Sequence, residues 1–327
     1  MVFREEDITK FINGRQFFIL TAVLFVVLTW IAPKDVTSLQ GASMGVCFQS
    51  VSTLVLPQLL SFLLSTVGMI GVGFLLAFLN KTYSYVREVT YVFSSTFLWL
   101  GIANPMIATH FYDGTILSIA VMLLALILFS TYQDGRQQRQ VYITFAILSA
   151  CCMFQYSFFY LIIVMIFGFM QMRAMGIRSF LAIVFGLITP YWIACGTGLI
   201  EWSQFQTPNL VSAWSSYAVE QSWSTISIIY ISIVLALTLF GMNVLQLISY
   251  KLQTRSYNGF FIALMLLTMI MMAIDYNNLL VYLPVLNICI AVQMAHAFTI
   301  RKHTRRYIPY LLFIALCVGL YAWQVFY

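Results

Sequence analysis

The stretch TYVFSSTFLWLGIANPMIATHFYDGTILSIAVMLLALILFSTY, residues 90–132, contains one charged side chain, Asp113. A helix needs about 20 apolar residues to cross the hydrocarbon core of a bilayer, so this stretch is too long for one crossing and suits two. The polar turn between them is His110-Phe-Tyr-Asp-Gly114. The stretch therefore predicts a helical hairpin inside a membrane.

The composition of the whole chain favours the same class of protein. Of 327 residues, 62% are hydrophobic and only 8% are charged, whereas soluble domains are about 45–50% apolar and about 25% charged. The net charge of +6 does not indicate nucleic-acid binding, because Lys and Arg stand in small groups between apolar runs. The expected partner is the lipid bilayer.

Eleven apolar segments are predicted to cross the membrane. Because basic residues flank both ends of Val141–Met172, this run is interpreted as two crossings that turn at Gln155-Tyr156-Ser157. The expected fold is all-α, a polytopic integral membrane protein with about eleven transmembrane helices in a single domain, residues 1–327. The segments are Phe17–Ala32, one within Pro57–Leu79, two in Thr90–Tyr132, two in Val141–Met172, Ser179–Ile200, Thr225–Tyr250, two in Phe260–Thr299, and Ile308–Phe326.

The basic residues predict the orientation of these segments. If the first 16 residues are cytoplasmic, alternation of the loops places fifteen Lys and Arg residues inside and only Lys34 outside. This is the positive-inside distribution of membrane proteins. We therefore expect a cytoplasmic N-terminus and an extracytoplasmic C-terminus. The inside residues are Arg4, Lys10, Arg15, Lys81, Arg87, Arg136, Arg139, Arg173, Arg178, Lys251, Arg255, Arg301, Lys302, Arg305 and Arg306.

Acidic residues follow several predicted spans on the outer side. Asp35 follows the first span, Asp113 and His110 share the third-to-fourth turn, and Asp275 and Asn277 share the ninth-to-tenth turn. We expect Asp35, Asp113 and His110 to be catalytic, and the other two to contact substrate in one outward-facing cavity. Carboxylates there can act as a base, bind a divalent metal or hold a cationic substrate. The alternative is that they cap turns at the water interface.

The polar segment 201–224 is expected to lie on the outer leaflet as an interfacial helix, because it is rich in aromatic residues and lacks Lys and Arg. Its Trp202 and Trp214 are candidates for stacking on a sugar ring. Two prolines, in Asn104-Pro105 and Thr189-Pro190, lie inside predicted spans and are expected to kink them.

Polar side chains inside the late spans allow two interpretations. Asn243 and Gln246 lie in the eighth span, and Asn287, Gln293 and His296 lie in the tenth. They either hydrogen-bond neighbouring helices, which is the usual role, or line a polar path. The six cysteines form no CxxC pair, and we expect them to behave as small apolar residues. Nucleotide-binding, zinc-protease and hydrolase motifs are absent from the sequence, so the cofactor is left open.

The arrangement resembles an uncharacterised family of polytopic inner-membrane proteins of Bacteroidota, mainly from Gly71 to Gly198, and more distantly the GT-C class of membrane glycosyltransferases. The likeness lies in the eleven spans, in Asp35 after the first span, and in the segment NPMIATHFYD, residues 104–113, which runs into a helix. The resemblance implies a place in the cell inner membrane and transfer of a sugar from a polyprenyl-linked donor at its outer face. Asp35 would be the base or a metal ligand there, supported by Asp113 and His110.

Two other functions stay open. A transporter or flippase would use the polar residues of the eighth and tenth spans as a cavity. A non-catalytic membrane subunit of an envelope complex would account for the lack of a strong catalytic motif.

Overall fold

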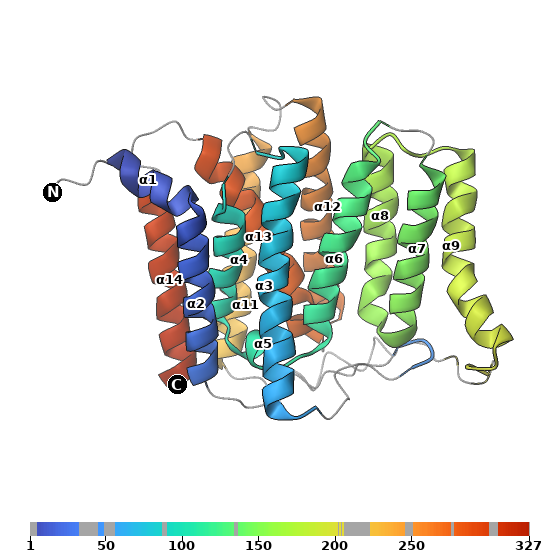
Figure 1. Cartoon of the computed structure of the whole chain (residues 1–327), viewed down its shortest axis with the longest axis horizontal. Helices are drawn as coiled ribbons and strands as arrows, with labels where there is room; N and C mark the ends of the chain where they lie inside the picture. Colours follow the sequence, from blue (N-terminus) through green and yellow to red (C-terminus); the bar gives the residue numbers. More distant parts are fainter. Residues whose placement is uncertain are drawn as a thin grey trace.

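A computed structural model describes residues 5–32, 45–48, 56–86, 90–133, 137–201, 203, 205, 223–245, 251–275, 278–300 and 307–326. The helices stand side by side in one bundle (Figure 1). Every regular element in these residues is a helix. They are α1 (Glu5–Asn13), α2 (Arg15–Ile31), α3 (Gln58–Tyr83), α4 (Val92–Ala103), α5 (Met106–Thr109), α6 (Asp113–Ser130), α7 (Gln138–Phe154), η3 (Tyr156–Phe158), α8 (Phe159–Gln171), α9 (Ile177–Gly196), α11 (Trp223–Val244), α12 (Leu252–Ile274), α13 (Leu279–Ile300) and α14 (Tyr307–Phe326).

The helices confirm the predicted class in its coarser form, a multi-pass helical membrane protein. Within the described residues, seven helices are long and apolar enough to cross a bilayer, and the bent pair α1–α2 makes up to eight. Each of the eleven apolar segments contains a helix, but α4 and α8 have only 12 and 13 residues. The figure of eleven crossings therefore stays a prediction.

The distribution of side chains is that of a protein surrounded by lipid. Large apolar side chains point outward, including Val67, Phe185 and Trp192, which are 67%, 61% and 72% exposed. Hydroxyl groups such as those of Thr21 and Thr268 are fully buried and bond to carbonyls of their own helices. Exposure of so many apolar side chains is unfavourable in water, whereas it is favourable in the hydrocarbon of a bilayer.

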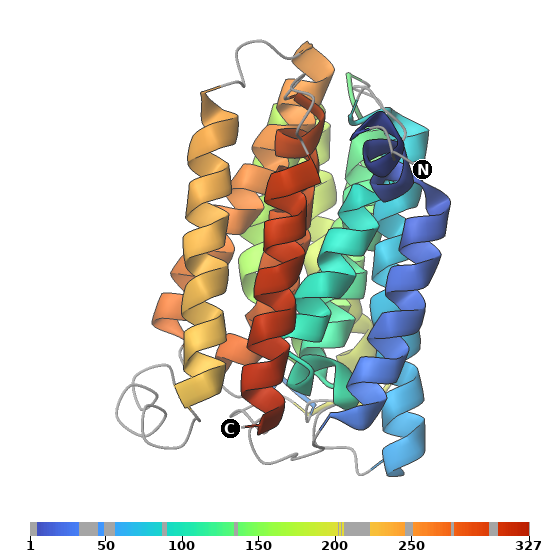
Figure 2. The same cartoon turned by 90° about the vertical axis from the view of Figure 1, so that its left-hand side faces the viewer.

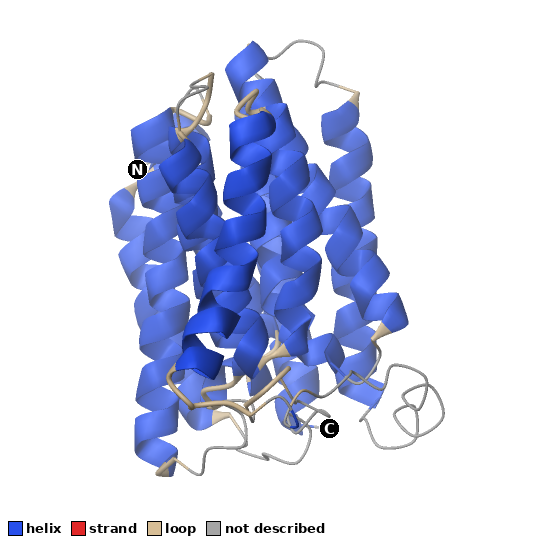
Figure 3. Cartoon of the chain, turned by 90° about the vertical axis from the view of Figure 1, so that its right-hand side faces the viewer, coloured by secondary structure: helices blue, strands red, loops and turns tan. Residues whose placement is uncertain are grey.

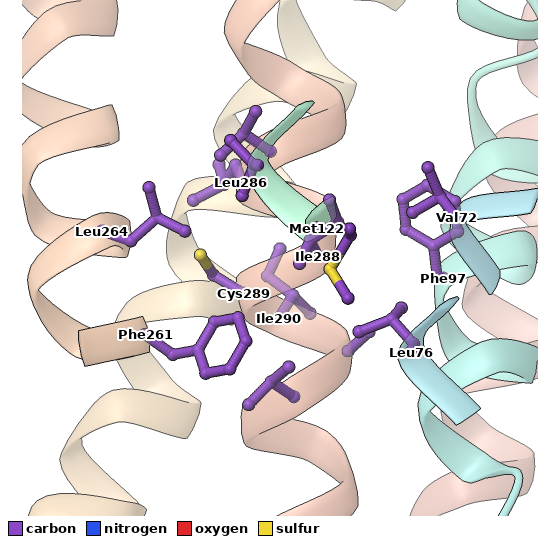
Figure 4. Close-up of a cluster of buried hydrophobic side chains, with 14 of the residues drawn as sticks. Val72, Leu76, Phe97, Met122, Phe261, Leu264, Leu286, Ile288, Cys289 and Ile290 are labelled. Carbon is purple, nitrogen blue, oxygen red and sulfur yellow. The ribbon is translucent and has the colours of Figure 1, made fainter. Parts of the chain in front are cut away.

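Helices α4 and α13 form the centre of the bundle. All 12 residues of α4 are buried, and α13 is buried along almost its whole length. Figure 4 shows side chains of α13 between those of α12 on one side and those of α3, α4 and α6 on the other. The labelled core residues are Val72, Leu76, Phe97, Met122, Phe261, Leu264, Leu286, Ile288, Cys289 and Ile290.

The first helix lies at one end of the bundle and is bent by 60° from α2. The backbone N–H of Tyr91 donates to the carbonyl of Asn13, which joins this end to the connection before α4. The last turn of α14 lies at the opposite end (Figures 2 and 3). The number of crossings and the side of the membrane on which each end lies stay predictions.

Local breaks in the helices agree with the sequence at two places and differ at three. The chain turns at Gln155, as predicted, and α4 ends just before Asn104-Pro105. In contrast, α9 continues through Pro190 without a break. Asp113 and Gly114 belong to the first turn of α6 rather than to a loop, because an acidic residue is favourable at a helix N-terminus. Trp223, assigned to the interfacial segment, begins α11.

A close approach between α7 and α9 depends on Gly186. A Cβ atom at this position would lie 2.8 Å from the carbonyl oxygen of Tyr142 and 3.0 Å from the Cβ of Phe145. Helix α9 packs mainly against α7, so the packing around Gly186 contributes much of what holds α9 in the bundle. Small residues allow such backbone contact between membrane helices.

We expect Gly186→Ala to lower the free energy of unfolding by about 1–3 kcal/mol, because the added methyl group forces the two helices apart. The matched control is Gly196→Ala in the same helix, where a Cβ would meet no atom within 4 Å. This control should be neutral or slightly stabilising. Unfolding of both variants in detergent checks the prediction, and equal stability of the two would contradict it.

Candidate functional site

The connection between α4 and α6 is buried, although connections usually run over protein surfaces. Asn104 is buried, and His110 and Asp113 are only 8% and 2% exposed. Three hydrogen bonds fasten this connection to other helices. The N–H of Phe111 donates to Ser61 Oγ of α3 at 2.8 Å, Gln324 Nε2 of α14 donates to Asn104 Oδ1 at 3.3 Å, and Tyr112 donates to the carbonyl of Leu280 in α13 at 3.1 Å. The connection is therefore a fixed part of the bundle.

The sequence explains how this connection positions Asp113. Pro105 cannot donate a backbone hydrogen bond, so α4 ends before it and the short helix α5 follows. His110 then has an extended backbone, with φ −130° and ψ 145°, which ends α5. Asp113 is the first residue of α6, where free N–H groups and the helix dipole favour a carboxylate.

Tyr112 joins the two turns at this end of the bundle that carry acidic residues. Its phenol bonds to Leu280 at the start of α13, which follows the Asp275 turn. Burial raises the pKa of Tyr112 well above its usual value, and the neighbouring Asp113 carboxylate raises it further. The phenol therefore stays protonated at physiological pH and keeps its role as a hydrogen-bond donor between the turns.

Two fully buried hydroxyl groups, those of Ser65 in α3 and Thr115 in α6, lie near the start of α6. The sequence pattern did not indicate them. Ser61, Ser65 and Gly68 lie along one face of α3, at spacings of four and three residues. Ser61 bonds to Phe111, and a Cβ on Gly68 would lie 2.7 Å from Thr115 Cγ2. Ser65, which lies between them, therefore faces the start of α6. Ser65 Oγ and Thr115 Oγ1 have no hydrogen-bond partner among the described residues.

Asp275 has a different environment, in which its carboxylate is bonded locally. Asn278 Nδ2 donates to both carboxylate oxygens, at 3.0 and 2.9 Å, and Tyr282 donates to Oδ2 at 2.8 Å. Asp275 is 7% exposed, and Asp113 is not among its recorded partners. These bonds fix the turn between α12 and α13, which supports the interpretation that this acid caps a turn.

The predicted site residues are therefore placed only in part. His110 in the connection before α6, Asp113 in the first turn of α6, and Asp275 at the end of α12 lie at the same end of the bundle, and Tyr112 links the two turns. Asp35, Asn277, Trp202 and Trp214 lie outside the described residues. Within the described residues, no three His, Cys, Asp or Glu side chains gather as metal ligands. The single outward-facing cavity stays a prediction.

Comparisons with known proteins do not add an assignment. No protein-family model matches the chain, and neither does any curated protein or any solved structure. The resemblance to the GT-C class is therefore an interpretation of the sequence alone. A functional proposal must rest on the positions of this chain's own residues.

A second polar cluster lies at the other end of the bundle, where α13 ends. Asn258 Oδ1 accepts hydrogen bonds from Tyr85 at 3.1 Å and from Gln293 Nε2 at 3.0 Å. Asn243 Nδ2 donates to Gln293 Oε1 at 2.7 Å and to its carbonyl oxygen at 2.9 Å. His296 meets Tyr85 edge to face, with ring centroids 4.5 Å apart. These buried groups connect α11, α12 and α13 to the connection after α3.

The second cluster contains two of the residues that a transport path would use, Asn243 and His296. Asn243 and His296 are engaged in contacts between helices, which supports the packing interpretation. Asn287 is buried as well, and its Oδ1 has no hydrogen-bond partner among the described residues. Gln246 lies outside the described part of the chain.

Proposed function

We propose that this protein transfers a sugar from a polyprenyl-linked donor to an acceptor hydroxyl at the outer face of a cell inner membrane. One observation carries the proposal, namely the buried Asp113 carboxylate at the start of α6, three residues after the buried His110 and at the same helix start as two buried hydroxyl groups, those of Ser65 and Thr115. Ionisable residues at such positions in membrane proteins are costly to bury, and they mark functional sites by default.

The proposed chemistry uses Asp113 as the general base. Its carboxylate takes the proton of the acceptor hydroxyl while the acceptor oxygen attacks the anomeric carbon of the sugar. The bond from that carbon to the lipid phosphate breaks, and the phosphate leaves with the electron pair. Ser65 and Thr115 offer hydrogen bonds to substrate oxygens, and His110 supports the turn that holds the base.

The surroundings of Asp113 suit a substrate that arrives from the bilayer. On α3, Ser61 and Ser65 face the Asp113 turn, whereas Leu63 and Val67 of the same helix are 49% and 67% exposed. A polyprenyl chain can lie along this apolar surface while its phosphate reaches the polar turn. Helix α3 thereby separates a lipid-facing side from the candidate site.

Deletion of the gene and reconstitution of the protein test the proposal. Cells that lack the protein should accumulate the polyprenyl-linked sugar at the outer leaflet, and proteoliposomes should release free lipid phosphate when given that donor and an acceptor. Accumulation at the inner leaflet instead would favour a flippase. Unchanged donor levels together with a stoichiometric partner in mild detergent would favour the non-catalytic subunit. Either of these results would overturn the transfer function.

A further inference from the structure

A chain of hydrogen-bonded side chains connects the α7–α8 break to the α12–α13 turn. Gln155 Nε2 donates to Ser157 Oγ at 3.3 Å, and Ser157 bonds to the phenol of Tyr282. Tyr282 in turn donates to Asp275 Oδ2 at 2.8 Å. Ser157 must donate to the Tyr282 oxygen, because the phenol proton is engaged with Asp275. Every donor in this chain therefore points towards the carboxylate.

The carboxylate at the end of this chain lacks a balancing positive charge. Its donors, the amide of Asn278 and the phenol of Tyr282, are both neutral. In the described part of the chain, Asp275 makes no ion pair. A buried carboxylate is costly unless it is paired with a cation or coordinates one. The turn thus has a net negative charge in a nearly closed environment.

Unsatisfied oxygen atoms lie at the two ends of this chain of hydrogen-bonded side chains. Asn278 Oδ1 and Gln155 Oε1 are buried and have no hydrogen-bond donor within the described ranges. The orientation of the Asn278 amide is fixed, because rotating it by 180° would bring its single oxygen against both carboxylate oxygens of Asp275. The amide nitrogen and oxygen are about 2.2 Å apart, so Asn278 Oδ1 lies within roughly 5 Å of both Asp275 oxygens. A cation that contacts Asn278 Oδ1 therefore lies close enough to the carboxylate to balance its charge.

We propose that Asp275 and Asn278 hold a small monovalent cation. Hard cations take carboxylate and amide carbonyl oxygens as ligands, and one carboxylate balances one positive charge. The same site accepts an alkali ion or the primary ammonium of a lipid headgroup, since both offer a compact positive charge to oxygen atoms. The bound cation links the α12–α13 turn to the α7–α8 break through Tyr282 and Ser157, independently of sugar transfer.

Unfolding of the purified full chain in an uncharged detergent tests this site. The salts are the chlorides of sodium, potassium, ethanolamine and N-methyl-D-glucamine, at equal ionic strength. We expect at least one of the first three to raise the unfolding temperature by roughly 2–6 °C over N-methyl-D-glucamine, with saturation. Sodium or potassium as the effective ion identifies an alkali site, and ethanolamine identifies a headgroup site.

Variants show whether Asp275 is responsible for the effect. Asp275→Asn and Asn278→Leu should each remove the dependence on the cation, whereas Glu201→Gln, an exposed acid near the end of α9, should keep it. Equal unfolding temperatures of the unmodified protein in all four salts would overturn the proposal, even if neither variant folds. A cation effect that persists in Asp275→Asn would overturn it as well.

Discussion

Replacing Asp113 with Asn should lower the rate of sugar transfer by about 10²–10⁴-fold while the helical bundle stays folded. The amide has nearly the same size as the carboxylate and can accept a hydrogen bond at the start of α6, but it cannot take the proton of the acceptor. Initial rates of lipid-phosphate release in proteoliposomes measure the effect. The unfolding temperature of the variant shows whether the fold is kept.

The control for this variant is Glu201→Gln, which removes an exposed carboxylate near the end of α9. Its transfer rate should equal that of the unmodified protein. Ser65→Ala should raise the Michaelis constant more than it lowers the turnover number, because the hydroxyl is assigned to substrate binding. Full activity of Asp113→Asn would exclude Asp113 as the base and leave Asp35 as the candidate.

Replacing Gln293 with Leu should lower the free energy of unfolding by roughly 2–4 kcal/mol. This side chain accepts a hydrogen bond from Asn243 and donates one to Asn258, so its loss leaves two buried amides without these partners. A remaining polar group without a partner costs more than the hydrogen bond itself contributed. Unfolding in mixed detergent micelles, followed by circular dichroism, measures the change.

The matched control is Asn287→Leu, a change from amide to leucine in the same buried helix. Asn287 Oδ1 has no hydrogen-bond partner in the described residues, so we expect this variant to differ from the unmodified protein by less than about 1 kcal/mol. Equal destabilisation by both changes would show that the hydrogen bonds of Gln293 contribute nothing beyond the volume of its side chain.

The positions of the helices could be predicted because the length of an apolar run is a local property. The turn at Gln155 was predicted from the basic residues on both sides of Val141–Met172, and α7 ends one residue before it. Asp113 was assigned to a loop, because the apolar run after it conceals where the helix starts. A helix boundary depends on single hydrogen bonds, which hydropathy does not report.

The candidate site could be predicted only through its charged residues. Asp113 and Asp275 stand out in an apolar sequence, whereas Ser65 and Thr115 do not, because hydroxyl residues are frequent in membrane helices. Their roles depend on how α3 is rotated towards α6, which is a property of packing. The contact between Tyr85 and Asn258 joins residues that are 173 positions apart. No local pattern indicates such a contact.

The burial of α4 has a consequence for how the protein is made. Helix α4 packs against α13 and α14, yet both of these helices are synthesised long after α4. Ser95 of α4 bonds to Tyr310 of α14 at 2.9 Å, across 215 residues. A nascent chain that stops before Leu279 therefore holds a central helix with two sides uncovered. Such incomplete chains should be the preferred substrates of membrane quality-control proteases, since the centre of the bundle closes only when α13 and α14 are in place.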